Sequence, residues 1–118
     1  MVTLQLKGGD TVTSVITENS VRRLGLEKGR DAMAIVKASN VLLGRAIDPE
    51  AFSARNILTG TITTQVAGAV NDEITIALPG GSTVTSIITS ASVLRMGLEV
   101  GKEISAIIKA SDVLLATV

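Results

Sequence analysis

The sequence predicts an all-β fold with short helices, built from two small β-barrels in tandem. The chain repeats itself at an offset of 72 residues: residues 1–44 and 73–116 share the same residue at 25 of 44 positions. Segments rich in β-branched residues alternate with glycine turns. Each repeat holds only one short helical pattern. These three observations predict two copies of one strand-rich module.

Each repeat contains a β-hairpin. Strand patterns over Glu73–Leu78 and Thr83–Thr89 flank a Pro-Gly-Gly-Ser turn. Their counterparts run over Val2–Leu6 and Thr11–Thr17 around Lys-Gly-Gly-Asp. The paired glycines permit positive φ at a tight connection, so the hairpin is expected twice.

A short helix is predicted after each hairpin. Ser90–Met96 and Glu18–Leu24 each follow a threonine and end before a glycine, Gly97 and Gly25. A glycine in this place is typical of a left-handed C-cap. Each helix is expected to be about two turns long.

A last strand is predicted after each helix and its Leu-Glu-x-Gly turn. It is expected to run from Ile104 to Ile108 and to continue past Lys-Ala-Ser to Val113–Leu115, with Ala32–Val36 and Val41–Leu43 as its twin. Strand, hairpin, short helix and strand in this order predict a small barrel of the OB type.

Residues 45–52 have no place in either repeat, and their charges and proline predict a linker. The predicted domains are therefore residues 1–44, a first repeat, and residues 53–118, a second repeat. The second hairpin is preceded by a strand over residues 57–63, with a bulge or bend expected at Gly60. The first hairpin has no such strand before it, so the first repeat is predicted to be N-terminally incomplete.

The amino-acid composition argues against several classes of function. Eleven basic and eleven acidic side chains are scattered along the chain, which argues against nucleic acid and membrane surfaces as partners. The absence of cysteine and histidine removes thiol chemistry, the usual zinc sites and the commonest general base. Neither a nucleophile with its base nor a pair of carboxylates is evident, so no enzyme activity is predicted. The sequence shows no signal peptide and no apolar run of membrane-spanning length, which favours the cytoplasm.

Four motifs in order carry a family resemblance. They are Ser-Ala-Arg-Asn (53–56), Gly-Ala-Val-Asn (68–71), Thr-x-x-Ser before a helix ending in Gly-Leu (89–98) and Lys-Ala-Ser-Asp-Val (109–113). Together they resemble the molybdate-binding Mop domain, also called TOBE, of the molbindins, and the two copies resemble a tandem di-Mop protein. The resemblance implies a protein that binds molybdate, or the similar tungstate, for storage or homeostasis without a cofactor. Tandem members carry Ser-Ala-Arg-Asn in both repeats, whereas this chain carries it once.

The resemblance also implies an oxyanion site that is assembled across a subunit boundary. Ser53 and Arg55 of one domain would meet the Thr, Ser and Lys-Ala-Ser elements of a neighbour. No protein side chain is expected to ligate the metal directly. The predicted oxyanion-binding residues are Ser53, Arg55, Thr17, Ser20, Lys37, Ala38, Ser39, Thr89, Ser92, Lys109, Ala110 and Ser111.

Physical chemistry supports this set of residues. A tetrahedral dianion needs converging hydrogen-bond donors and limited positive charge. Thr89 and Ser92, like their twins in the first repeat, stand where a strand feeds a helix N-terminus, whose free amides favour an anion. Lys109 supplies charge and is followed by two small residues that let the backbone approach an oxyanion. Ser53 and Arg55 alternate along one strand and can face the same side.

Each motif also has a structural interpretation. Thr-x-x-Ser is a common N-cap, and Gly-Ala-Val-Asn is typical of a turn. Lys109 and Lys37 are plausible solvated strand residues. Arg55 has Asp72 and Glu73 as candidate ion-pair partners.

Three alternative functions stay open. The chain is compatible with a molybdate-sensing regulatory module of a larger transcription factor or transporter ATPase. It is also compatible with a structural oligomerisation module whose sites are vestigial. An OB-fold nucleic-acid binder is disfavoured, because Phe52 is the only aromatic residue and stacking platforms need several.

Self-assembly is expected from the same resemblance. Family members build closed rings of six domains, which a tandem chain reaches as a homotrimer. The first repeat is predicted to expose unpaired sheet edges. One prediction is that residues 51–64 of a neighbouring chain pair with these edges by strand exchange. The alternative is that the chain is truncated at Met1.

Overall fold

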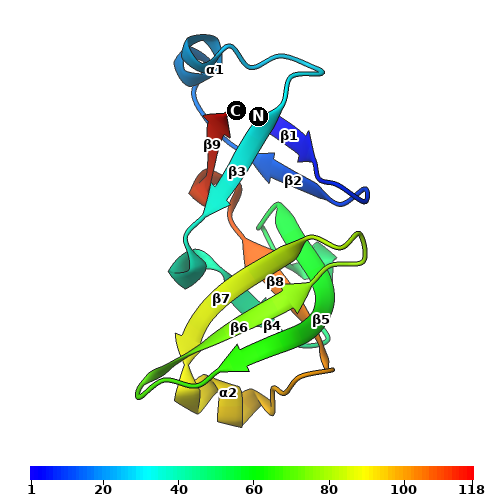
Figure 1. The fold of residues 1–118 in the computed structure, drawn as a ribbon, viewed down its shortest axis with the longest axis vertical. Coiled ribbons are helices and arrows are strands. Elements are labelled where there is room, and N and C mark those ends of the chain that lie inside the picture. The colour runs from blue at the N-terminus through cyan, green and yellow to red at the C-terminus, as the bar shows by residue number, and fades with distance from the viewer.

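Two strand-rich units follow one another along the long axis of the molecule (Figure 1). The computed structural model describes all residues 1–118 and extends over 44 × 28 × 26 Å. Helix α1 (Glu18–Leu24) lies near one end and helix α2 (Ser90–Met96) near the other. Neither helix has the length and apolar character needed to cross a membrane.

The lower unit in Figure 1 is a five-stranded antiparallel sheet. The hydroxyl of Ser86 donates a hydrogen bond of 2.6 Å to the carbonyl oxygen of Val41, which ties the last strand of the sheet to the chain next to its first strand. The sheet thus curls into the predicted OB-like form. Its strands in spatial order are β4 (Leu42–Gly44), β8 (Glu103–Ile108), β5 (Asn56–Val66), β6 (Asn71–Ala77) and β7 (Thr83–Thr89).

The upper unit contains two separate strand pairs. Strand β1 (Val2–Gln5) pairs with β2 (Thr11–Ser14), and β3 (Ala32–Val36) pairs with β9 (Val113–Thr117), both antiparallel. The predicted hairpins are confirmed in both units as β1–β2 and β6–β7.

The last strands are exchanged between the two sequence repeats. Strand β9 comes from the second repeat and pairs with β3 of the first, whereas β4 comes from the first repeat and pairs with β8 of the second. The two pairings have the same register: Ile35 lies opposite Leu114, and 72 residues on, Ile107 lies opposite Leu42. Each unit therefore contains a strand of the other repeat, and the units are interlocked.

The prediction that each last strand continues past Lys-Ala-Ser was wrong. The 3-10 helices η1 (Ala38–Asn40) and η3 (Ala110–Asp112) interrupt it in both repeats. In η1, for example, the amide of Asn40 donates to the carbonyl oxygen of Lys37 at 2.8 Å. These tight turns redirect the chain from one unit to the other, which an uninterrupted strand would not do.

The hydrophobic core is concentrated in the five-stranded unit. Strands β5, β6 and β8 supply half of its twelve residues, and α2 adds Val93. By contrast, α1 has no buried residue. The core consists of Val12, Val41, Ile62, Ile74, Ile76, Leu78, Val93, Leu98, Ile104, Ala106, Ile108 and Val113.

The bulge expected at Gly60 was misplaced. Strand β5 passes through this residue without a break, and its register against β6 shifts only between Ile62 and Thr64. A Cβ atom on Gly60 would lie 2.2 Å from the carbonyl oxygen of Ala77. Glycine is therefore needed because β6 approaches closely, while the bulge comes later in the strand.

Residues 45–52 lie against the lower unit. They include the short 3-10 helix η2 (Pro49–Ala51), which begins behind the side chain of Asp48. The guanidinium of Arg45 donates to the carbonyl oxygen of Met96 at 2.7 Å and so satisfies the C-terminal end of α2. Assignment of this segment as the domain boundary stays a prediction.

Candidate functional site

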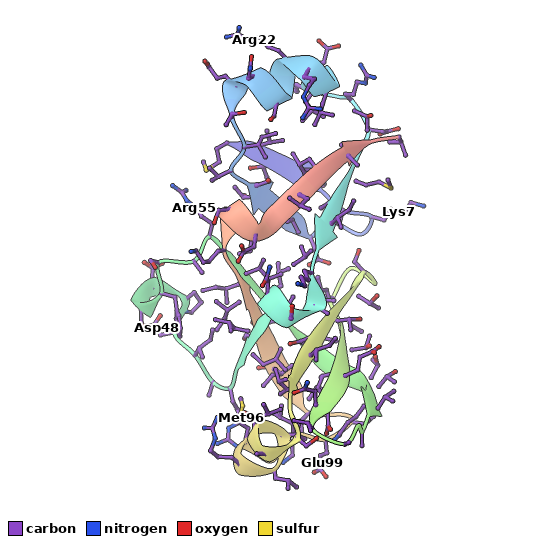
Figure 2. All side chains as sticks on the ribbon, turned by 90° about the vertical axis from the view of Figure 1, so that its left-hand side faces the viewer. Lys7, Arg22, Asp48, Arg55, Met96 and Glu99 are labelled. Atoms are coloured by element: carbon purple, nitrogen blue, oxygen red, sulfur yellow. The ribbon has the colours of Figure 1, made fainter.

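A groove of about 610 Å³ gathers six of the residues that the sequence predicted as oxyanion ligands. It lies where the segment before β5, the end of β8 and the two Lys-Ala-Ser turns meet, and Figure 2 shows Arg55 about midway along the molecule. The six residues are Ser39, Ser53, Arg55, Lys109, Ala110 and Ser111.

Asn56 fixes the segment that carries Ser53 and Arg55. Its side-chain oxygen accepts from the amide of Thr13, and its side-chain nitrogen donates to the carbonyl oxygen of Thr13, both at 2.8 Å. Asn56 is buried, and its two hydrogen bonds join β5 of the lower unit to β2 of the upper unit. Asn56 was not among the residues predicted from the sequence, although it ends the Ser-Ala-Arg-Asn motif.

The turn η3 (Ala110–Asp112) holds Lys109 and Ser111 in the lining of the groove. The amide of Asp112 donates to the carbonyl oxygen of Lys109 at 2.9 Å, which closes the turn. Ala110 is buried, and its carbonyl oxygen accepts from the amide of Val15 at 3.0 Å. A small residue at position 110 thus lets the turn pack against the end of β2.

The groove carries a positive formal charge. Arg55, Lys109 and Asp112 are its ionisable lining residues, which gives two positive charges against one negative charge. Neither ion pair of the structure, Arg22–Glu18 or Lys102–Glu99, involves them. Asp112 was not predicted from the sequence as a lining residue, although it follows directly on Lys-Ala-Ser.

The Lys-Ala-Ser segment of the first repeat is divided between two cavities. Ser39 reaches the groove just described, whereas Ala38 lines an apolar cavity of about 450 Å³ beside Val41. Lys37 lines neither of them and precedes η1 at the end of β3, as Lys109 precedes η3 at the end of β8. The two lysines therefore occupy equivalent places with different surroundings.

The Thr-x-x-Ser motifs lie outside the groove, at the starts of the helices. The hydroxyl oxygens of Thr17 and Thr89 each accept a hydrogen bond of 3.1 Å from the amides of Ser20 and Ser92. The N-cap interpretation is therefore confirmed for both helices. Within one chain the structure does not bring these four residues to Ser53 and Arg55.

Asp72 takes part in a separate polar cluster at the start of α2. A hydrogen bond of 2.5 Å from the hydroxyl of Ser90 lowers the pKa of Asp72 below its ordinary value, and further bonds from the Gly68 amide and the Gln65 side chain act in the same direction. Arg55 takes part in neither ion pair of the structure, so its pairing with Asp72 or Glu73, which the sequence left open, is not formed. Gly-Ala-Val-Asn lies at the connection from β5 to β6, with a bend at Ala69 and Val70, and its Asn71 begins β6.

The sequence of this chain is similar to those of a known family of proteins. A family model described as the TOBE domain matches residues 1–43 and 53–115. The molybdenum-pterin-binding protein MopA of Rhodobacter capsulatus is 41% identical over 98% of this chain and 43% of its own length. The molybdenum transport protein ModE of Azotobacter vinelandii is 37% identical over 98% of this chain and 42% of its own length. The chain therefore spans about two fifths of the length of these curated relatives.

A solved structure covers nearly the whole chain. It is that of ModG, described as a cytoplasmic molybdate-binding protein, in a form with molybdate bound. The TM-score is 0.89 and the sequences are 46% identical, over 98% of this chain and 82% of ModG. The arrangement of the two interlocked units is thus shared with a second protein.

Proposed function

Because this chain belongs to the TOBE domain family, we propose that it binds molybdate, and tungstate by the same chemistry, to store or buffer the anion in the cytoplasm. The observation that carries this proposal is the groove that combines two cationic side chains with three serines. The similarity to MopA, a molybdenum-pterin-binding protein, and to ModG, a molybdate-binding protein, supports the choice of ligand.

The chemistry of the groove suits a tetrahedral dianion. Arg55 offers a planar fork of N–H donors, and Lys109 offers a compact positive charge. The hydroxyls of Ser39, Ser53 and Ser111 add neutral donors that direct hydrogen bonds without further charge. The formal charge of the groove only partly balances a dianion, so neutral donors are needed for tight binding.

We propose that a second copy of the chain completes the site. Thr17 with Ser20, and Thr89 with Ser92, lie at helix starts on the surface of the molecule, away from Arg55. From a neighbouring copy, either pair would bring hydroxyls and helix amides to the open side of the groove. A closed homotrimer of tandem chains allows all copies to exchange these contacts equivalently.

Isothermal titration calorimetry with molybdate tests the proposal. Arg55→Ala and Lys109→Ala are each expected to weaken binding about tenfold or more, because each removes a charge-assisted hydrogen bond to the anion. Lys37→Ala is expected to have a smaller effect, since Lys37 does not line the groove. Arg22→Ala is the matched control, because Arg22 is exposed on α1 and pairs only with Glu18. Unchanged affinity in both groove variants would contradict the proposed site.

Native mass spectrometry of the same samples separates the alternatives. Discrete molybdate adducts on a closed oligomer agree with storage. An oligomer that takes up no oxyanion would instead identify a structural assembly module. The subunit number found with molybdate also tests the trimer directly.

A sensing module is the second candidate. Nearly the whole chain matches about two fifths of ModE of Azotobacter vinelandii, and ModE of Yersinia pestis is described as a transcriptional regulator. This similarity favours a sensing module. Fusion of residues 1–118 to a monomeric DNA-binding domain tests it. Operator binding that depends on molybdate would favour sensing, whereas operator binding indifferent to molybdate would favour storage.

A further inference from the structure

One carboxylate lies among the cations of the groove that is proposed to hold molybdate, hereafter the anion groove. Asp112 lines this groove together with Arg55 and Lys109, and it is half-buried. An ionised carboxylate accepts hydrogen bonds but donates none, so it repels a fully deprotonated oxyanion such as molybdate. The anion groove thus contains one charge that opposes the proposed ligand.

The side chain of Asp112 has no partner within the protein that would account for its charge. The aspartates whose carboxylates accept hydrogen bonds are Asp10, Asp48 and Asp72, and Asp112 is not among them. It also takes part in neither ion pair of the structure. The charge of Asp112 therefore faces the groove without being neutralised by a direct contact.

The first repeat forms the same turn without this charge. Asn40 is the equivalent of Asp112, 72 residues earlier, and it lines the same groove. In both turns the amide of this residue donates to the carbonyl oxygen of the lysine three positions before it, at 2.8 Å in the first repeat and 2.9 Å in the second. The next residue has φ −91° and ψ 112° in the first repeat and φ −92° and ψ 112° in the second. The carboxylate is thus not needed to form the turn.

The backbone on both sides of Asp112 is held in place. Val113 is 1% exposed, and its carbonyl oxygen accepts from the hydroxyl of Ser14 at 2.6 Å. Ala110 is buried, and its carbonyl oxygen accepts from the amide of Val15 at 3.0 Å. The carboxylate can therefore rotate, but its backbone cannot withdraw from the groove when an anion enters.

We propose that Asp112 sets how tightly the anion groove holds a dianion. This inference rests on the proposed function and concerns the same site. Two positive charges and one negative charge leave the lining residues with a formal charge of +1, and without the carboxylate the charge would be +2, which balances a dianion. Asp112 thus weakens binding and allows the anion to exchange, as a buffering protein requires.

The same carboxylate also affects specificity. The Coulomb energy between Asp112 and a ligand is proportional to the charge of the ligand. A dianion is therefore disfavoured more strongly than a monoanion of the same shape. Perrhenate provides this comparison, because it is a tetrahedral oxyanion of nearly the same size as molybdate and carries one negative charge instead of two.

Isothermal titration calorimetry of Asp112→Asn with molybdate and with perrhenate tests the proposal. The substitution is expected to tighten molybdate binding about tenfold and perrhenate binding about threefold, because the repulsion that it removes is twice as large for the dianion. The gain for molybdate is expected to be smaller at about 1 M than at about 0.1 M sodium chloride, because salt screens the charge. A change in the shape of the groove would affect the two anions alike.

The reverse change in the other turn tests the same idea. Asn40→Asp adds a second carboxylate to the lining of the groove and is expected to weaken molybdate binding more than perrhenate binding. Thermal melts identify any loss of folding in either variant. Asp112→Asn is expected to fold, because Asn40 already forms the same turn in the first repeat.

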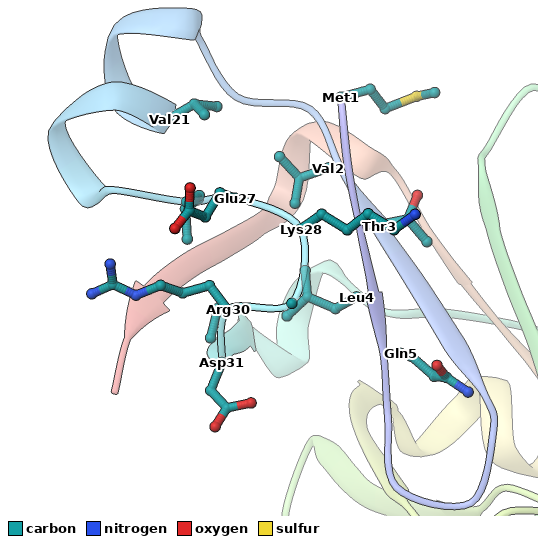
Figure 3. Close-up of a pocket in the computed structure, with 13 residues that line it drawn as sticks. Met1, Val2, Thr3, Leu4, Gln5, Val21, Glu27, Lys28, Arg30 and Asp31 are labelled. Atoms are coloured by element: carbon teal, nitrogen blue, oxygen red, sulfur yellow. The ribbon is translucent and has the colours of Figure 1, made fainter.

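Asp31→Asn is the matched control, since it removes the same charge from another part of the chain. Asp31 is exposed in the loop that leads into β3. It lines a separate groove of about 620 Å³ between β1 and this loop, which shares no residue with the anion groove (Figure 3). Its change is expected to leave both affinities within about twofold.

The outcomes distinguish this inference from the proposed function. Equal molybdate affinity of the native chain and Asp112→Asn would refute the role of Asp112 and leave the proposed function intact. An equal gain for molybdate and perrhenate would also refute it, because the effect would not follow charge. Molybdate binding by Asp112→Asn alone would support the inference and contradict storage by the native chain. An absence of molybdate binding in both proteins would overturn both proposals.

Discussion

At the scale of single residues, hydrogen bonds to Asp72 lower the pKa of its carboxyl group. Three donors converge on it, from Ser90, Gly68 and Gln65, and they stabilise the charged form. The carboxylate thus joins the start of α2 to the turn between β5 and β6. Since it accepts from Ser90, the first residue of α2, it also adds negative charge at one of the helix starts proposed to meet the anion.

This arrangement predicts a dependence of stability on pH. The folded pKa of Asp72 lies below its ordinary value of 3.8, so the stabilisation is present above that value and is lost as the pH falls through the folded pKa. Urea titrations between pH 5 and pH 2, a range of about three units around that value, are expected to show a steeper loss of stability for the native chain than for Asp72→Asn. Glu73→Gln, at an exposed neighbour, is the control. Equal slopes for the native chain and Asp72→Asn would refute the role of Asp72.

Motifs and the family resemblance together named candidate residues of the site but not which of them lie in one groove. Arg55, Lys109 and Ser111 were named from their motifs and lie in one groove, whereas Thr89 and Ser92 lie elsewhere in the chain. Motif residues mark chemistry because each side chain has fixed donors and charge. Which of them meet depends on strands distant in sequence, so the grouping was not predictable.

At the scale of elements, the two helices have the same caps but different support. Both are seven residues long, begin behind a threonine and end at a glycine with φ near +65° (67° and 64°). Helix α2 buries Val93 in the core, while α1 buries nothing. The sequence predicted the bounds of both helices correctly, because capping hydrogen bonds join residues only a few positions apart.

The difference in support predicts unequal effects of cap removal. Thr89→Ala is expected to lower the free energy of unfolding by about 1 kcal/mol, because α2 unfolds together with the core to which Val93 belongs. Thr17→Ala is expected to lower it less, because α1 can fray locally without exposing buried side chains. Urea denaturation measures both changes. Thr89→Ser keeps the hydroxyl and should remain close to the native value; a larger loss in Thr17→Ala than in Thr89→Ala would contradict this account.

At the scale of the whole molecule, the exchanged strands hold the two units together. Strand β4 pairs with β8, and β9 pairs with β3, so each unit contains chain from both sides of residues 45–52. Buried bonds reinforce the exchange: the hydroxyls of Ser86 and Ser14 donate to the carbonyl oxygens of Val41 and Val113, both at 2.6 Å. The units are therefore expected to behave as one body.

Cleavage between the repeats tests this connection. A protease recognition sequence in place of residues 48–51 is expected to give two fragments that still elute together on size exclusion, because the exchanged strands join them. Urea before chromatography should separate the fragments and serves as the control. Separation under native conditions would show that the exchange does not hold the units together.

The sequence by itself determined the local structure of this protein: both hairpins, both helices with their caps and the residues that carry the chemistry of the groove. The reason is that these features depend on hydrogen bonds and turn geometry within a few residues. Only the tertiary structure decided that β4 and β9 change places, that Asn56 joins the units and that a groove stays open between β1 and β3. The two repeats are so alike that each last strand fits either sheet in the same register, and the choice is made by turns and contacts that join residues far apart in the sequence.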